Sequence, residues 1–133
     1  MKRAFELDGI RCDSLDHFYD EVTRVLGLAK WGRNLDALND ILRGGFGTPE
    51  GGFLLRWRNS DEARRMLGFG ETLKFLERKL TRCHPTNVES TWADIAAVRR
   101  KEGPTLFDML VEIIRDHGIG GKQAKDGVDL ELV

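Results

Sequence analysis

The sequence has few cysteines and no long apolar run. Cys12 and Cys83 are its only cysteines, and two isolated thiols make neither a disulfide framework nor a zinc site. No apolar stretch approaches the roughly 18 residues that cross a bilayer. The basic start is typical of a signal peptide, but Glu6 and Asp8 interrupt the apolar segment that would have to follow. We therefore expect no membrane segment, no secretion signal and a place in the reducing cytoplasm.

An excess of charge of either sign is also missing. Lys and Arg number 21 against 22 for Asp and Glu, which gives a formal net charge of −1. A chain so balanced has no general attraction for nucleic acid or for an anionic membrane, so any electrostatic function must be local. The basic clusters at 64–65 and 99–101 have acids around them and no interleaved aromatics. We expect solvated helix faces there and no direct contact with nucleic acid.

Motifs of catalysis and of metal binding are absent as well. The sequence contains no glycine-rich phosphate loop, no ordered set of nucleophile, histidine and acid, and no His/Cys spacing typical of a metal site. Asp36 and Asp40 stand four apart, but a metal site needs more converging ligands. We expect His117, at the end of an apolar helix, to satisfy helix carbonyls. No enzyme activity, cofactor or metal is therefore predicted.

Periodicity predicts alternating strands and helices in a single domain of 133 residues, 41% of them hydrophobic. Asp13 or Ser14 is expected to cap the first long helix, Asn34 the second, and Ser60 a short third one. Strands separated by helices imply right-handed crossovers, so we expect an α/β protein with a small parallel sheet covered by helices. The predicted strands are 2–7, 53–57 and 128–133, and the predicted helices are 15–26, 35–42, 61–67, 71–82, 91–100 and 104–117.

The segment WGRNLDALNDIL, residues 31–42, carries the most specific pattern in the sequence. It closely resembles the helix-two signature of the barstar family, in which an aromatic and a glycine precede a variable residue, then N-L-D-A-L, one more residue and an aspartate. The order of predicted elements over residues 3–67 and 104–133 agrees with that family. The apolar stripe of the segment is Leu35, Leu38, Ile41 and Leu42, and the opposite face carries Asp36, Asn39, Asp40 and Arg43.

The resemblance implies a three-stranded parallel sheet and inhibition of barnase-like ribonucleases. In that family the second helix and its preceding loop enter the RNA-binding cleft of the nuclease. This implies a basic ribonuclease toxin as the protein partner and an immunity role for the inhibitor. Gly32, Asn34, Asp36 and Asp40 match the contact loop and the acidic helix face of that family. The residues that we expect to bind the partner are Trp31, Gly32, Arg33, Asn34, Asp36, Asn39, Asp40, Arg43 and Phe46.

Three positions depart from the family pattern. Arg33 stands where an acid is common, Asn39 where a tryptophan is common, and Lys30 replaces an aromatic. We therefore expect the partner to be a toxin related to the target of barstar but distinct from it. The alternative is a protein-interaction module with the barstar fold that has lost nuclease inhibition.

Residues 68–103 have no counterpart in the short members of the family, and we interpret them as a helical insertion within the domain 1–133. Apolar residues in this segment need a partner of their own. We expect the inward residues to be Leu73, Leu76 and Leu80 on the first helix and Trp92, Ile95 and Ala96 on the second.

The acidic pair Asp36 and Asp40 suits a ribonuclease target. Residues four apart lie on one helix face, about one turn from each other. A ribonuclease cleft holds phosphate with Arg, Lys and His side chains, so a fixed carboxylate can replace a phosphate oxygen there through charge-assisted hydrogen bonds. An ordinary solvated helix face is the other interpretation of the same pair.

Overall fold

A three-stranded parallel sheet forms the base of the molecule. The computed structural model describes residues 2–44, 48–49 and 51–133. The strands pair in the order β1-β2-β3 and both pairings are parallel, which confirms the predicted α/β class. The strands are β1 (Ala4–Asp8), β2 (Phe53–Arg58) and β3 (Val128–Leu132).

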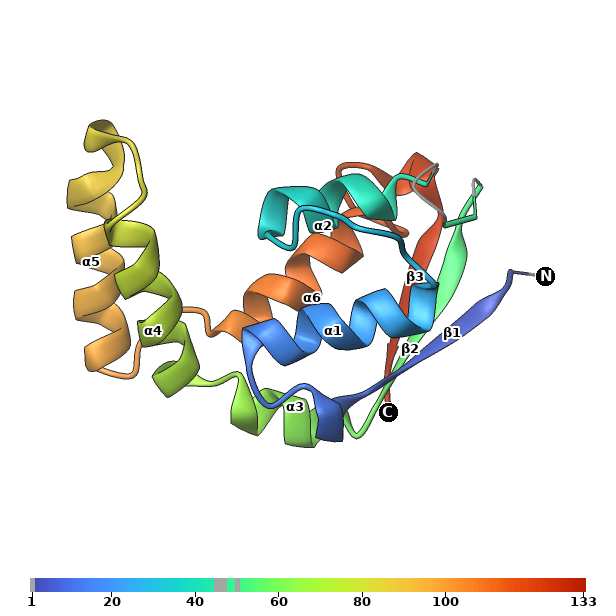
Figure 1. The fold of residues 1–133 in the computed structure, drawn as a ribbon, viewed down its shortest axis with the longest axis horizontal. Helices are drawn as coiled ribbons and strands as arrows, with labels where there is room; N and C mark the ends of the chain where they lie inside the picture. The colour runs from blue at the N-terminus through green and yellow to red at the C-terminus, as the bar shows by residue number, and fades with distance from the viewer. Residues whose placement is uncertain (1, 45–47, 50) are drawn as a thin grey trace.

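Helices cover one face of this sheet, as Figure 1 shows. Side chains alternate along each strand, so one set points toward the helices and the other toward solvent. Helix α1 packs on β1, α6 packs on β3, and α2 packs on α6. The strand residues buried under them are Phe5, Leu7, Phe53, Leu55, Trp57 and Val128. The helices of this layer are α1 (Leu15–Leu26), α2 (Leu35–Leu42) and α6 (Leu106–Asp116).

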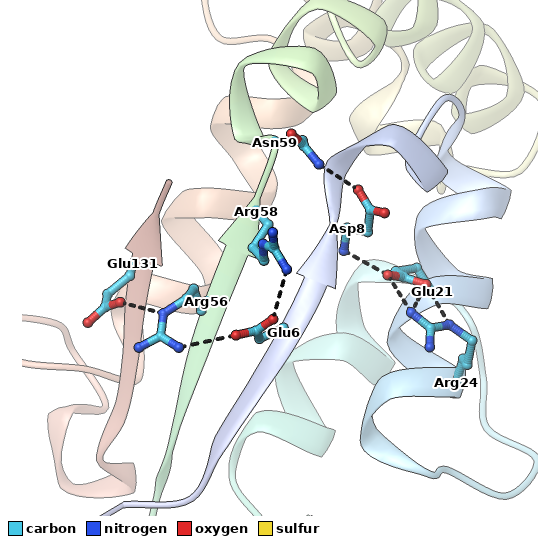
Figure 2. A network of polar contacts seen from close by, with 8 residues as sticks. All are labelled: Glu6, Asp8, Glu21, Arg24, Arg56, Arg58, Asn59 and Glu131. Carbon is cyan, nitrogen blue, oxygen red and sulfur yellow. Dashed lines mark hydrogen bonds and ion pairs between the residues drawn. The ribbon is translucent and has the colours of Figure 1, made fainter.

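The other face of the sheet carries a charged network (Figure 2). Arg56 of the central strand lies between two acids, with Nε 3.0 Å from Glu131 of β3 and Nη1 3.2 Å from Glu6 of β1. Arg58 Nη1 lies 3.4 Å from the second oxygen of Glu6. Exposed pairs of this kind are each worth about 0–1 kcal/mol. Their main effect is to keep the uncovered face polar while joining the three strands.

The local signals for helix ends are mostly confirmed. The Ser14 side chain accepts a hydrogen bond from the His17 N–H at 3.1 Å, and Gly27 ends α1 with φ 64°. The predicted cap at Ser60 is wrong, because α3 (Ser60–Met66) already includes that residue and follows Asn59, which has φ 52°. The Ser60 hydroxyl instead donates to the carbonyl of Val133 at 3.1 Å, which fixes the last residue against the end of β2.

Two further helices, α4 and α5, form a pair at one end of the molecule (Figure 1). Each begins two or three residues before its predicted start, and a short 3-10 turn joins them. The pair has an apolar cluster of its own, formed by Leu76, Ile95 and Val98. The bounds are α4 (Phe69–Leu80), the turn Pro85–Asn87 and α5 (Val88–Arg99).

The predicted inward face of α5 is partly wrong. Trp92 is 51% exposed and Ala96 is exposed, whereas Thr91, Ile95 and Val98 are buried. The reason is that α4 covers only one narrow side of α5, and that side is the stripe at i, i+4 and i+7.

In the described parts of the chain, no helix is both long and apolar enough to cross a membrane.

Candidate functional site

Helix α2 has one apolar face and one polar face, and the cap at Asn34 fixes where the helix begins. The Asn34 side chain accepts a hydrogen bond from the Ala37 N–H at 2.7 Å and starts the helix, as predicted. Leu38 and Ile41 are then 1% and 2% exposed and pack into the core. Asp36 and Asp40 therefore point outward.

The loop that precedes α2 is fastened to α1. Trp31 is half-buried, its Nε1 donates to Thr23 Oγ1 at 2.7 Å, and its ring packs edge-on against Tyr19 with centroids 5.5 Å apart. At Gly32 an added Cβ would stand 3.0 Å from the Ala37 Cβ, so a side chain there would crowd the first turn of α2. These contacts hold the loop against α1 just before α2 begins.

Arg33 is held by the same helix. Its φ of 51° places it in the left-handed region, which is rare for a residue with a side chain. The guanidinium lies 2.8 Å from the Asp20 carboxylate and donates to the Asp16 carbonyl at 3.1 Å. Part of the charge of Arg33 is therefore neutralised within the chain.

The exposed stripe of α2 consists of Asp36, Asp40 and Arg43. The two carboxylates are separated by four residues, or about 6 Å along the helix axis. Arg43 Nη1 lies 3.5 Å from Asp40 Oδ1, and both side chains are more than half exposed. Neither carboxylate is buried, so cationic groups of a partner can reach both of them.

Asn39 and Arg43 have partners far along the sequence. His117 is fully buried, with Nε2 2.7 Å from Asn39 Oδ1 and Nδ1 2.7 Å from Asp126 Oδ2. Gln123 donates to Asn39 Oδ1 at 3.3 Å and accepts from Arg43 Nε at 2.8 Å. The expectation that His117 satisfies helix carbonyls is wrong, because the segment after α6 folds back over α2 and supplies better placed partners.

The structure brings most of the predicted site residues onto one surface. We call Gly32, Arg33, Asn34, Asp36, Asp40 and Arg43 the α2 surface, and all six are exposed. Trp31 and Asn39 lie beside it, half-buried and bonded within the chain. Phe46 lies outside the described residues. Sequence reasoning missed Gln123, since no local pattern reports a hydrogen bond to a residue 80 positions away.

Metal ligation has no support in the described part of the chain. There, no three His, Cys, Asp or Glu side chains gather in a group that is able to hold an ion. The side chains exposed at the α2 surface carry carboxylate, guanidinium and amide groups.

The fold and this surface define a small α/β protein that presents the acidic face of one helix to solvent beside a three-stranded parallel sheet. The family model described as "Barstar (barnase inhibitor)" matches residues 2–89, which is 88 of the 133 residues. The chain belongs to the barstar family. The match includes the whole α2 surface and runs through α4, but it stops before α6 and β3. A search of curated proteins finds no match.

Proposed function

We propose that this chain is a stoichiometric inhibitor of a barnase-like ribonuclease, and that its α2 surface enters the RNA-binding cleft. One observation carries the proposal most directly. Asp36 and Asp40 are exposed together on a helix whose opposite face is anchored in the core. The description of the family as barnase inhibitors supports the same target class.

The chemistry of inhibition follows from the charges of the two surfaces. A ribonuclease cleft holds phosphate with cationic side chains, so Asp36 and Asp40 would offer these side chains charge-assisted hydrogen bonds in place of phosphate oxygens. The anchors at Trp31 and His117 hold the helix in place before binding. A preorganised surface loses less conformational entropy on association.

The biological role that suits such an inhibitor is immunity. The chain would act in the cytoplasm, where it would protect a bacterium from its own toxin or that of a neighbour. Its partner would be a basic ribonuclease protein, and the chain itself would carry out no catalysis and would not bind nucleic acid.

We also propose that residues 68–103 are an insertion in a barstar-like domain. Leu76 of α4 and Ile95 and Val98 of α5 form an apolar cluster of their own, and Phe75 of α4 packs against both this cluster and the main core. We expect α6, which contacts β3, to be the last helix of the barstar-like domain.

A second candidate function is an interaction module without nuclease inhibition. Two observations favour it: Arg33 pairs with Asp20, and the Asn39 oxygen contacts His117. Both positions are departures from the family pattern, and both side chains are bonded inside this chain. A different protein would then bind at the α2 surface.

A titration distinguishes the two functions. Residual RNA cleavage is measured for a panel of small basic bacterial ribonucleases, including barnase and any basic ribonuclease encoded beside this chain, against increasing amounts of pure protein. We expect cleavage by at least one of them to end at one molar equivalent, because an occupied cleft cannot admit RNA. The Glu112→Ala variant is the matched control for substitutions of Asp36 or Asp40, because it removes an exposed acid of α6 away from the α2 surface.

The ionic strength dependence gives a second criterion. Association should slow as salt rises, because an acidic helix and a basic cleft attract each other before contact. If the folded chain inhibits no member of the panel, the inhibitor proposal fails and the interaction module becomes the better interpretation.

A further inference from the structure

A cleft opens directly beside the α2 surface. Its volume is about 500 Å³, and it lies between the first turn of α2, the start of α1 and the outer half of α4. In Figure 1 the first turn of α2 is the end of that helix that lies nearer to α4. The lining residues from the α2 side include Arg33, Asn34 and Asp36, and those from α4 and the residues after it include Phe75, Arg78, Lys79 and Arg82.

The α4 wall of this cleft is basic. Phe75 packs against the main core, and Arg78 and Lys79 follow it at i+3 and i+4, so they share its helix face. Arg82 lies just after the end of α4 and lines the same cleft. We call these three cations the basic strip. All three are exposed, and within the described residues none of them lies in an ion pair. The strip therefore presents three cations that have no ion-pair partner among the described residues, and it lies beside an acidic helix.

This arrangement sets a requirement on the partner. A ribonuclease with uniformly basic flanks would be attracted by Asp36 and Asp40 but repelled by the strip, and like charges brought together across an interface cost several kcal/mol. A partner with an acidic segment beside its basic cleft would match both surfaces. Repulsion of unsuitable partners is a common source of specificity.

We propose that the cleft receives an acidic segment of the same ribonuclease whose RNA-binding cleft receives α2. This inference rests on the proposed function and adds the feature that selects the partner. The basic strip then acts as a specificity determinant. It accepts nucleases with an acidic flank and rejects those without one.

RNA itself fits the cleft less well. Asp16 and Asp36 stand in the same lining as the basic strip. A polyphosphate backbone threaded through the cleft would have to pass these two carboxylates, whereas an acidic protein segment carries its charges only where its side chains place them. The experiment below treats RNA as the competing ligand.

A charge-reversal pair tests the strip. The full-length variant Arg78→Glu/Arg82→Glu is compared with Arg99→Glu/Arg100→Glu, which alters exposed residues of the same helical pair outside the cleft lining. Both variants change the net charge by the same amount. The readout is the association rate with the ribonuclease that the chain inhibits. For the strip variant we expect a fall of roughly tenfold or more at low salt and little difference at high salt, whereas the control should stay close to wild type.

The same assay separates the two proposals. If Asp40→Ala weakens inhibition but the strip variant behaves as its control does, the proposed function stands and the inference about the cleft is overturned. If Asp40→Ala inhibits as the wild type does, the α2 surface is not the inhibitory element and the proposed function fails.

A second readout needs no nuclease. The ¹⁵N-labelled full chain is titrated with a hexaglutamate peptide and, separately, with a uridine hexanucleotide. We expect the peptide to shift the backbone signals of Asn34, Asp36 and the basic strip, and we expect the strip variant to lose this response. Stronger binding of the RNA, or no response to the peptide, would overturn the inference even if the chain inhibits no nuclease in the panel.

Discussion

The Nε2 atom of the buried His117 imidazole lies 2.7 Å from Oδ1 of Asn39. This contact joins the end of α6 to the middle of α2, across 78 positions of sequence. Asp126 holds the other ring nitrogen at 2.7 Å. Helix α2 is therefore fixed both by its apolar face and by a polar network from the segment before β3.

Asn39→Ala tests whether this residue supports the fold or contacts the partner. The substitution leaves His117 Nε2 buried without that partner, and an unsatisfied buried polar group costs about 1–3 kcal/mol. We expect a loss of that size in the free energy of unfolding, measured with urea. Gln123→Ala removes the longer 3.3 Å contact to the same oxygen and an exposed contact to Arg43, but it leaves His117 bonded to Asn39 and should cost less. A stable Asn39→Ala variant with weakened nuclease binding would instead make Asn39 a contact residue.

The sequence predicts features that depend on nearby residues and misses those that depend on distant ones. Ser14 and Asn34 cap their helices as predicted, because a cap bonds an N–H only three residues ahead. The Asn39–His117 contact leaves no such local pattern. The prediction that Trp92 points inward is wrong for a related reason, because its burial depends on how much of α5 the neighbouring helix covers.

Substitutions on opposite faces of α2 separate binding from folding. Asp40→Ala should change the free energy of unfolding by less than about 1 kcal/mol, because it removes only an exposed pair with Arg43 and introduces the best helix former. It should nevertheless cost about 2–5 kcal/mol of nuclease affinity, since cationic groups of the partner would be left desolvated and unpaired. Affinity is measured by inhibition titration, and stability by urea unfolding.

Leu38→Ala is the matched change on the inward face. Leu38 is 1% exposed, so its truncation should lower the free energy of unfolding by about 2–5 kcal/mol through a cavity in the core. The folded fraction should still bind the nuclease, because the exposed stripe is unchanged.

Wild-type affinity in the Asp40→Ala variant would show that a surface other than the α2 surface binds the partner.

The two cysteines should differ sharply in reactivity. Cys12 is fully buried, and burial raises the pKa of its thiol to about 12, with the nearby Glu21 carboxylate adding to the effect. The thiolate is the reactive form, so Cys12 should resist alkylation in the native protein. Cys83 is partly exposed and should react. A thiol count with Ellman's reagent should give one group in buffer and two in urea, and Cys83→Ser should give none in buffer.

The exposed pair of Asp13 and His17 should be visible by NMR titration. A hydrogen bond to the Asp13 carboxylate holds the pKa of His17 above its ordinary value of 6.5. Because the folded-state pKa is raised, this pair stabilises the fold at pH below 6.5, and the contribution is lost as the pH rises through the raised pKa. Asp13→Asn should bring the pKa back toward 6.5, whereas Asp20→Asn should have a smaller effect. An unchanged pKa in Asp13→Asn would contradict the contact.

Trimming the helical pair tests how α4 and α5 belong to the domain. The first turns of α4 contact the body directly: Thr72 Oγ1 accepts from the buried Leu106 N–H at 2.7 Å, and Glu71 accepts from the Leu15 N–H at 3.1 Å. Phe75 also packs against the main core. A deletion of residues 70–100 therefore removes real support, whereas a cut that begins beyond Phe75 spares it.

Two shortened chains make the comparison. In one, a short glycine-serine linker replaces residues 79–92, and in the other it replaces residues 70–100. The first should unfold in one cooperative urea transition with near wild-type stability of the main core. The second should lose several kcal/mol, since the Leu106 N–H alone is left buried without an acceptor at a cost of about 1–3 kcal/mol. Because the first also lacks Lys79 and Arg82, its association with an acidic-flanked nuclease should slow while its α2 surface remains intact. Loss of cooperative unfolding in the first would show that the outer half of the helical pair is part of the main core, and the insertion proposal would then be wrong.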